Sequence, residues 1–188
     1  MKIEKLTPII EACLASAEQP LTINHLFDLF VGDLEHPSKD EIRQSIQLIT
    51  ESCEQRGFEV KQVASGFRLQ VKQQYEPWVT RLLQQKPPRY SRALLETLAL
   101  VAYRQPVTRG EIEEVRGVSV SSQIIKTLQE REWVKVLGHK DVPGKPALYG
   151  TTRQFLDYFN LKSLNELPTL AAIKDLDSFN PELALGIQ

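Results

Sequence analysis

The chain has 188 residues, of which 41% are hydrophobic and 25% are charged, and its formal net charge is −1. These values are ordinary for a soluble globular protein, and the length suits one average domain or two small ones. The basic excess of a protein that binds DNA phosphates is absent from the chain as a whole. Residues 91–162 are nevertheless mildly basic, and residues 163–188 are acidic.

Neither a membrane segment nor a disulfide is expected. No stretch approaches the roughly 18 apolar residues that span a bilayer. The N-terminal residues include acidic side chains and no long apolar run, unlike a secretory signal, so we expect a cytoplasmic protein. Cys13 and Cys53 lie in helical patterns without a C-x-x-C motif, and we expect both to be buried, reduced thiols.

A tetrapeptide repeat indicates two related halves. Gln-Pro-Leu-Thr at residues 19–22 returns as Gln-Pro-Val-Thr at residues 105–108. Each copy follows a run with apolar residues at three- and four-residue spacing, which is typical of an amphipathic helix. Proline ends each helix, and Thr22 and Thr108 are predicted to be N-caps of the next one.

Both copies continue with the same predicted elements. Ser38 and Glu41 in the first copy, and Thr108 and Glu111 in the second, have capping-box spacing. The first copy predicts a helix over 22–30, a helix from Ser38, strands over 58–63 and 67–71 around a Ser65-Gly66 turn, and a closing helix over 76–85. The second predicts a helix over 108–115, a helix from near Ser119, strands over 133–137 and 147–151, and a closing helix over 153–160.

Three helices followed by a two-stranded hairpin form the winged-helix variant of helix-turn-helix. The predicted fold is therefore mainly α with small β-hairpin wings (α+β), as two tandem winged-helix domains at residues 1–86 and 91–162. The linker Lys86-Pro87-Pro88-Arg89 is expected to be stiff and to hold the domains apart. Residues 163–188 are expected to be an acidic tail, either a short amphipathic helix or a loosely attached segment.

Catalytic chemistry has no motif in the chain. The loop from Gly138 to Lys145 lacks the spacing of a Walker A loop, and Pro146 stands where Ser or Thr would hold magnesium. The three histidines, His25, His36 and His139, lack the spacing of helical metal ligands. No nucleophile motif is present either. We therefore expect no enzyme activity, no cofactor and no metal.

Specific DNA recognition is not favoured by the helices that would read bases. The predicted third helix of the first copy carries more acidic than basic residues. The corresponding helix of the second copy presents only Ser122, Lys126 and Gln129, and its wing adds Lys140 and Lys145. DNA association is expected to be weak or indirect. Winged helices also bind proteins, and the fold alone does not decide between these uses.

A long ordered set of residues in the second half carries a family resemblance. Its parts are Leu94-Leu95-Glu96-Thr97-Leu98-Ala99, Ala102-Tyr103-Arg104-Gln105-Pro106-Val107-Thr108, Glu111-Ile112-Glu113, Arg116-Gly117-Val118, the stretch from Gly138 to Thr152, Phe155-Leu156-Asp157-Tyr158-Phe159 and Leu164-Asn165-Glu166-Leu167-Pro168. In these residues the chain resembles the segregation and condensation protein B (ScpB) family. Residues 1–90 match it by organisation more than by motif. One departure is Glu132, where the family pattern leads us to expect Gly.

The resemblance implies a non-catalytic adaptor of an SMC–kleisin complex that acts in chromosome condensation and segregation in the cytoplasm, at the nucleoid. It implies a homodimer formed chiefly through the N-terminal domain, and a C-terminal domain that binds the kleisin ScpA. SMC, which carries the ATPase, is reached indirectly through ScpA. The alternative reading is a tandem winged-helix DNA-binding transcriptional regulator.

Within the resembling half, nine residues are candidates for partner binding. Aromatic, arginine and proline side chains in loops of mixed charge suit a protein interface. Other readings stay open: Tyr103 caps a helix end, Trp133 belongs to the core, or Pro143-Gly144 only shapes a turn. The candidates are Tyr103, Arg104, Gln105, Pro106, Trp133, His139, Pro143, Gly144 and Pro146.

Overall fold

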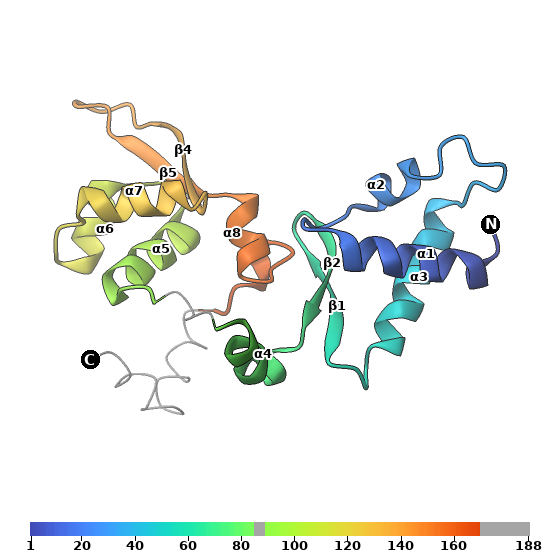
Figure 1. Cartoon of the computed structure of the whole chain (residues 1–188). Helices are drawn as coiled ribbons and strands as arrows, with labels where there is room; N and C mark the ends of the chain where they lie inside the picture. Colours follow the sequence, from blue (N-terminus) through green and yellow to red (C-terminus); the bar gives the residue numbers. More distant parts are fainter. Residues whose placement is uncertain (85–88, 170–188) are drawn as a thin grey trace.

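Two groups of helices, each with a small antiparallel sheet, lie side by side in the computed structural model, which describes residues 1–84 and 89–169 (Figure 1). Residues 1–84 are called the first unit below, and residues 89–169 the second unit. Helices together with two small antiparallel sheets make an α+β fold, as predicted from the sequence. In both units the main helices and the two hairpin strands follow the order that the sequence predicts, and a two-residue strand in the second unit and a one-turn helix in each unit are additions to it.

The first unit is built on three helices and a hairpin. Its elements are α1 (Ile3–Ser16), α2 (Ile23–Asp28), α3 (Lys39–Ser52), β1 (Phe58–Val63), β2 (Gly66–Val71), the one-turn helix η1 (Gln73–Tyr75) and α4 (Glu76–Leu83). Thr22 caps α2, and Ser38 with Glu41 forms the predicted capping box of α3. The core residues come from α1, α2 and α3 at helical spacing, and Cys53 is buried among them, whereas Cys13 is only half-buried.

The second unit repeats this order with an added strand. Its elements are α5 (Arg92–Arg104), β3 (Val107–Thr108), α6 (Arg109–Arg116), α7 (Ser122–Glu130), β4 (Val134–His139), β5 (Ala147–Thr151), α8 (Arg153–Tyr158) and the one-turn helix η2 (Leu164–Glu166). Helix α7 begins later than the predicted start near Ser119. Val120 is buried and its amide donates to the Glu113 carboxylate at 2.8 Å, so Ser121 becomes the cap of α7.

The repeated tetrapeptide performs the same structural task in each unit. Leu21 forms an isolated antiparallel β-bridge to Phe67, so a single residue pairs with the first hairpin in the manner of a third strand. At the equivalent place Val107 pairs with Tyr149 and Thr108 with Leu148, giving a three-stranded sheet of order β3-β5-β4. The sequence shows the repeat but not this pairing, because one or two paired residues are too short for a strand pattern.

The two units contact each other directly, which corrects the expectation that the linker holds them apart. The turn between β1 and β2 meets α8 and the residues after it (Figure 1). The Ser65 amide donates to the Asp157 carboxylate at 2.9 Å, and the Arg68 guanidinium donates to the Asp157 carbonyl at 3.0 Å and the Asn160 side chain at 2.7 Å. These four residues are called the inter-unit clasp below.

The start of the predicted tail belongs to the second unit. Leu164 and Leu167 pack against its core, so the packed chain extends beyond the predicted boundary at residue 162. The predicted helical residues Ile173 and Leu176 lie outside the described residues, as do Lys86, Pro87 and Pro88 of the linker.

Candidate protein-interaction surface

Four predicted residues lie at the carboxyl end of α5, and they have different roles. Arg104 is exposed and makes no hydrogen bond or ion pair with the described part of the chain. Tyr103 is half-buried, and its hydroxyl donates to the Pro168 carbonyl at 2.5 Å. Pro106 is exposed after the turn. Arg104 is therefore the member of this group whose charge is free for a partner.

Gln105 has a structural role at the same place. Its side-chain amide donates to the Ala102 carbonyl at 3.1 Å and to the Thr151 hydroxyl at 3.0 Å. Its carbonyl oxygen accepts from the Thr151 amide at 2.8 Å. Gln105 thus connects the end of α5 to the end of β5, and its hydrogen-bonding groups are already used inside the unit.

Trp133 lies in the core of the second unit, as in the alternative that the sequence left open, and it has little surface to offer a partner. Its side chain is only 2% exposed. The indole ring packs against Tyr90, Tyr158 and Phe159, with centroids 5.2, 4.6 and 5.5 Å away. The Arg131 guanidinium lies over the rings of Tyr90 and Trp133. Aromatic residues are common in protein cores and in protein interfaces, so the sequence alone does not distinguish the two roles, whereas the packing does.

The remaining predicted residues lie on the loop between β4 and β5, called the wing loop (residues 140–146). His139 ends β4 next to this loop and is exposed, as are Pro143 and Gly144, whereas Pro146 is half-buried. Gly144 has φ 84, a left-handed conformation that glycine adopts without steric cost. The loop joins two antiparallel strands, whereas a phosphate-binding loop leads from a strand into a helix.

One ion pair holds the wing loop against α6. The Lys140 ammonium lies 2.6 Å from the Glu111 carboxylate, which also accepts from the Thr108 amide at 2.7 Å. The hydrogen bond from Lys140 is the main cause that lowers the pKa of Glu111 to about 2, and the hydrogen bonds from Thr108 contribute less. Glu111 therefore stays ionised over the physiological range, and it fixes both the α6 capping box and the base of the wing.

An apolar groove beside Tyr103 is the surface that the sequence did not reveal. It has a volume of about 290 Å³ between α5, α8 and the segment after α8. Its rim residues Leu95 and Phe159 are 40% and 39% exposed. The groove is lined by Leu95, Leu98, Ala99, Ala102, Tyr103, Phe155, Phe159, Leu161, Leu167 and Pro168. Of the nine predicted residues, only Tyr103 lines it.

A signal for this groove is present in α5. Leu94, Leu98 and Val101 face the core, as one amphipathic face requires. Leu95 and Ala99 repeat at four-residue spacing beside that face, so α5 carries more apolar surface than one core stripe needs. An apolar lining of this kind, which includes a tyrosine, suits an amphipathic helix of a protein partner.

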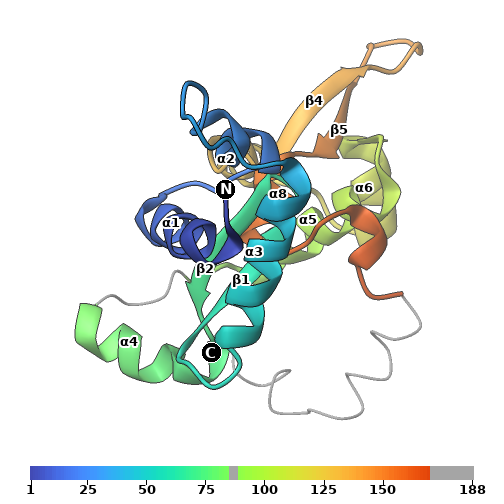
Figure 2. The same cartoon turned by 90° about the vertical axis from the view of Figure 1, so that its right-hand side faces the viewer.

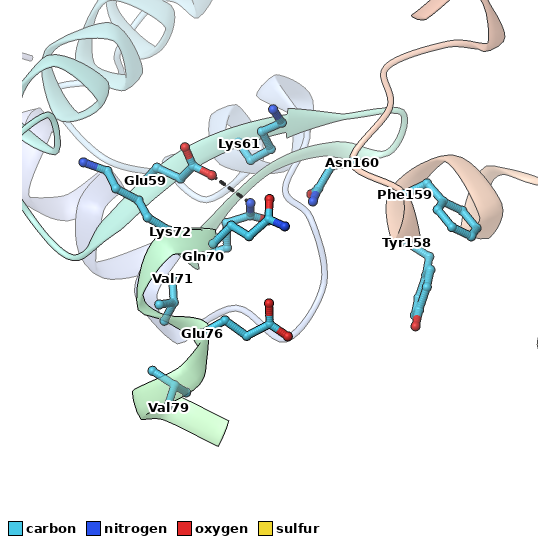
Figure 3. Close-up of a pocket in the computed structure, with 11 residues that line it drawn as sticks. Glu59, Lys61, Gln70, Val71, Lys72, Glu76, Val79, Tyr158, Phe159 and Asn160 are labelled. Carbon is cyan, nitrogen blue, oxygen red and sulfur yellow. Dashed lines mark hydrogen bonds between the residues drawn. The ribbon is translucent and has the colours of Figure 1, made fainter. Parts of the chain in front are cut away.

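A second hollow lies between the two units, with a volume of about 700 Å³ (Figure 3). The hairpin and the start of α4 form one wall, and Tyr158, Phe159 and Asn160 form the other. Two lysines and two glutamates line it, and Glu59 already accepts a hydrogen bond from Gln70 at 2.9 Å. This mixture of charges favours neither an anionic nor a cationic ligand.

The surface predicted to face DNA bases offers few side chains for DNA contacts in the structure. Ser122, Lys126 and Gln129 are exposed on α7 as predicted. Lys126 pairs with Glu130 at 3.6 Å, and Arg109 at the start of α6 pairs with Glu113 at 3.0 Å. Phosphate contacts need cations that are not already matched by neighbouring carboxylates.

Residues 1–84 and 89–169 contain neither a candidate metal site nor a candidate membrane span. These residues contain no group of three or more side chains placed to hold a metal ion. No helix among them is both long and apolar enough to cross a bilayer.

Comparison with known proteins decides the family. The family model described as "Segregation and condensation complex subunit ScpB" matches residues 8–170. The chain belongs to this family. A segregation and condensation protein B homolog from Coxiella burnetii is 54% identical over 185 residues, covering 96% of this chain and 88% of that protein. The segregation and condensation protein B of Syntrophotalea carbinolica is 40% identical, covering 94% and 87%.

Two solved structures show a more distant likeness. ScpB from Mycobacterium tuberculosis is 28% identical, with a TM-score of 0.40 over 85% of this chain and 97% of that chain. A dimer of an ScpB N-terminal domain complexed with an ScpA peptide is 22% identical, with a TM-score of 0.37 over 43% of this chain and 96% of that chain. The family assignment rests on the family model and the relatives.

Proposed function

We propose that the chain is the non-catalytic ScpB subunit of an SMC–kleisin complex that acts in chromosome condensation and segregation. In this proposal, two winged-helix units form the chain, the first unit makes the homodimer, and the second unit binds the kleisin ScpA. SMC is then reached through ScpA, and the ATPase activity belongs to SMC. Family membership supports the assignment.

The observation that carries the proposal is the apolar groove on the second unit. It exposes Leu95 and Phe159 at its rim, and Tyr103 also lines it. An amphipathic helix places residues of three- and four-residue spacing into such a groove. Arg104, which follows Tyr103 and has no partner among the described residues, can form a bidentate pair with a carboxylate of that helix.

The wing loop is the second proposed contact. His139, Pro143 and Gly144 are exposed there, and the Lys140–Glu111 pair fixes the base of the loop. A fixed loop loses little conformational entropy when a partner binds, which favours affinity. Gln105 and Trp133 support these surfaces from inside the unit and contact no partner.

The test measures ScpA binding by calorimetry with full-length variants. Leu95→Glu places a charge in the groove and is expected to weaken binding by about 2–4 kcal/mol, and Arg104→Ala by about 1–3 kcal/mol. Leu48→Glu is the matched control, because Leu48 lies on α3 of the first unit and is also 40% exposed.

Three outcomes would count against this assignment. If Leu48→Glu weakens binding more than Leu95→Glu, the roles of the two units are reversed. If neither variant changes ScpA binding while the wild-type chain shifts DNA at physiological salt, the chain is a DNA-binding regulator instead. Sustained ATP turnover by the purified chain would contradict the non-catalytic role.

A further inference from the structure

Helix α4 exposes large apolar side chains that nothing in the described chain covers. Trp78, Leu82 and Leu83 are 63%, 79% and 55% exposed, and α4 has no buried residue. Tyr75, just before the helix, is 39% exposed. These four residues are called the α4 stripe. Tyr75, Trp78 and Leu82 are three and four residues apart, which places them on one side of the helix, and Leu83 lies next to Leu82 at the border of that side.

A helix of this length needs a packing partner. Isolated helices shorter than about 12–15 residues are marginal in water, and α4 has 8 residues. Its main neighbour among the described elements is η1, which is a single turn. Figure 2 shows α4 at the edge of the molecule, beside the hairpin and away from α1 and α2.

We propose that the α4 stripe is the contact between two copies of the chain, packing against the same stripe of the second copy about a two-fold axis. The proposal rests on the homodimer proposed above and names its interface. A two-fold contact uses the same patch on both copies, so the patch must be self-complementary. The α4 stripe contains no charged side chain and therefore meets its own copy without repulsion.

The stripe can form the apolar centre of a contact with a second copy. Its exposed side chains present on the order of 400 Å², which is about half of the ~800 Å² that each partner buries in a standard interface. Tryptophan at the centre of such a patch is typical of residues that carry most of the binding energy. A second copy is present wherever the chain is made, so it can cover this surface at all times.

The experiment uses the two tryptophans of the full-length chain as reporters. Trp133 is buried and resists acrylamide quenching at every concentration, whereas Trp78 is open to the quencher in a single chain. Between nanomolar and 100 micromolar protein, we expect Trp78 to become shielded while sedimentation shows monomer turning into dimer. A Trp78→Phe variant assigns the quenchable fraction.

Substitutions in the stripe should separate the two copies. Leu82→Glu is expected to raise the dimer dissociation constant at least about 100-fold, and Leu82→Ala less, with unchanged circular dichroism. Ile9→Glu is the matched control, because Ile9 is a 40% exposed apolar residue on α1 of the same unit. It is expected to remain dimeric.

The outcomes distinguish this inference from the proposed function. If the wild type dimerises while Trp78 stays quenchable and Leu82→Glu stays dimeric, the α4 inference is wrong and the homodimer stands. If Trp78 becomes shielded only when ScpA is added, or is exposed in monomer lacking residues 170–188 but shielded in full-length monomer, another occupant covers α4. A wild type that stays monomeric throughout overturns both the α4 interface and the proposed homodimer, but leaves ScpA binding as a separate measurement.

Discussion

The two units share one order of helices and strands, but their hairpins differ in what they contact. In the first unit the hairpin turn is short, and it points into the molecule, where Ser65 and Arg68 meet α8. In the second unit the wing loop is longer and its tip is exposed. The first unit has an uncovered apolar helix, α4, whereas the second has an apolar groove.

Under the proposed function, this contrast places partner specificity in the parts of the two units that differ. The repeated residues at 19–22 and 105–108 serve the scaffold, since both copies pair with their own hairpin. The features that differ, namely the hairpin tips and the last helices, form the surfaces. A shared scaffold therefore does not predict a shared function, and each unit must be tested through its own surface.

The largest expected effect on stability comes from Gly66, the residue that lets the first hairpin approach Leu21 of the repeated tetrapeptide. Gly66 has φ 141, and a Cβ there would lie 2.4 Å from the Leu21 carbonyl oxygen. Gly66→Ala is therefore expected to destabilise the chain by about 3 kcal/mol or more, because backbone must move and the φ value is strained. Chemical denaturation measures this loss.

Gly110→Ala is the control for that substitution. Gly110 lies inside α6, and a Cβ there would meet no atom within 4 Å. Replacing glycine by alanine in a helix interior stabilises by about 0.5–1 kcal/mol. Equal, small effects at both positions would contradict the close approach of the hairpin to Leu21.

A smaller effect is expected from opening the inter-unit clasp. Arg68→Met removes all three guanidinium hydrogen bonds, two between the units and one to Gln70, but keeps the aliphatic stem, at an expected cost of about 1–2 kcal/mol. The two units should then unfold in separate calorimetric steps, and the radius of gyration should rise. Arg43→Met, at an exposed arginine on α3, is the control and should change neither.

Local signals in the sequence predicted most of the fold. The caps at Thr22, Ser38 and Thr108 were predictable because each cap depends on residues within three positions. The strands Phe58–Val63 and Ala147–Thr151 match their predicted bounds. The bridge at Leu21 and the clasp at Asp157 were not predictable, because they join segments far apart in the chain.

The candidate surface was predicted less well, for a physical reason. A family motif marks residues that pack as well as residues that bind, so Gln105 and Trp133 were indistinguishable from Arg104 in the sequence. The groove needs α5, α8 and the segment near Pro168 together, and no local pattern reports that meeting. Arg104, His139, Pro143 and Gly144 are exposed, and their role in binding stays a prediction.

The Lys140–Glu111 ion pair at the base of the wing loop should make the stability of the second unit depend on pH in the acidic range. Because the pKa of Glu111 is about 2 in the folded chain against 4.5 ordinarily, its ionised form stabilises the fold above about pH 4.5. This contribution fades as pH falls from 4.5 towards 2. Glu111→Gln should therefore be less stable than the wild type at pH 7, with the difference shrinking below pH 4.5.

Urea unfolding at several pH values measures that difference. Both side chains of the pair are partly exposed, so added salt should also reduce it. Glu114→Gln is a control on the same helix, since Glu114 makes no ion pair among the described residues and attracts Lys140 more weakly than Glu111 does. A wild-type-to-variant gap that stays constant down to pH 2 would show that the Lys140–Glu111 pair does not form in solution.

The smallest expected effect, and the one that raises stability, is at Glu132. This residue joins α7 to β4 at φ 57, in the left-handed region that disfavours side chains with a Cβ. Its carbonyl accepts a hydrogen bond from the Thr152 hydroxyl, so the backbone conformation is held from outside. The Glu132 side chain is exposed and has no partner among the described residues, so removing it breaks no contact.

Glu132→Gly relieves the strain but adds backbone entropy to the unfolded chain, so the expected net gain in stability is only about 0.5–1 kcal/mol. Glu130→Gly, in the last turn of α7, should instead destabilise by a similar amount. A loss of stability at both positions would mean that the turn before Trp133 does not require a left-handed residue.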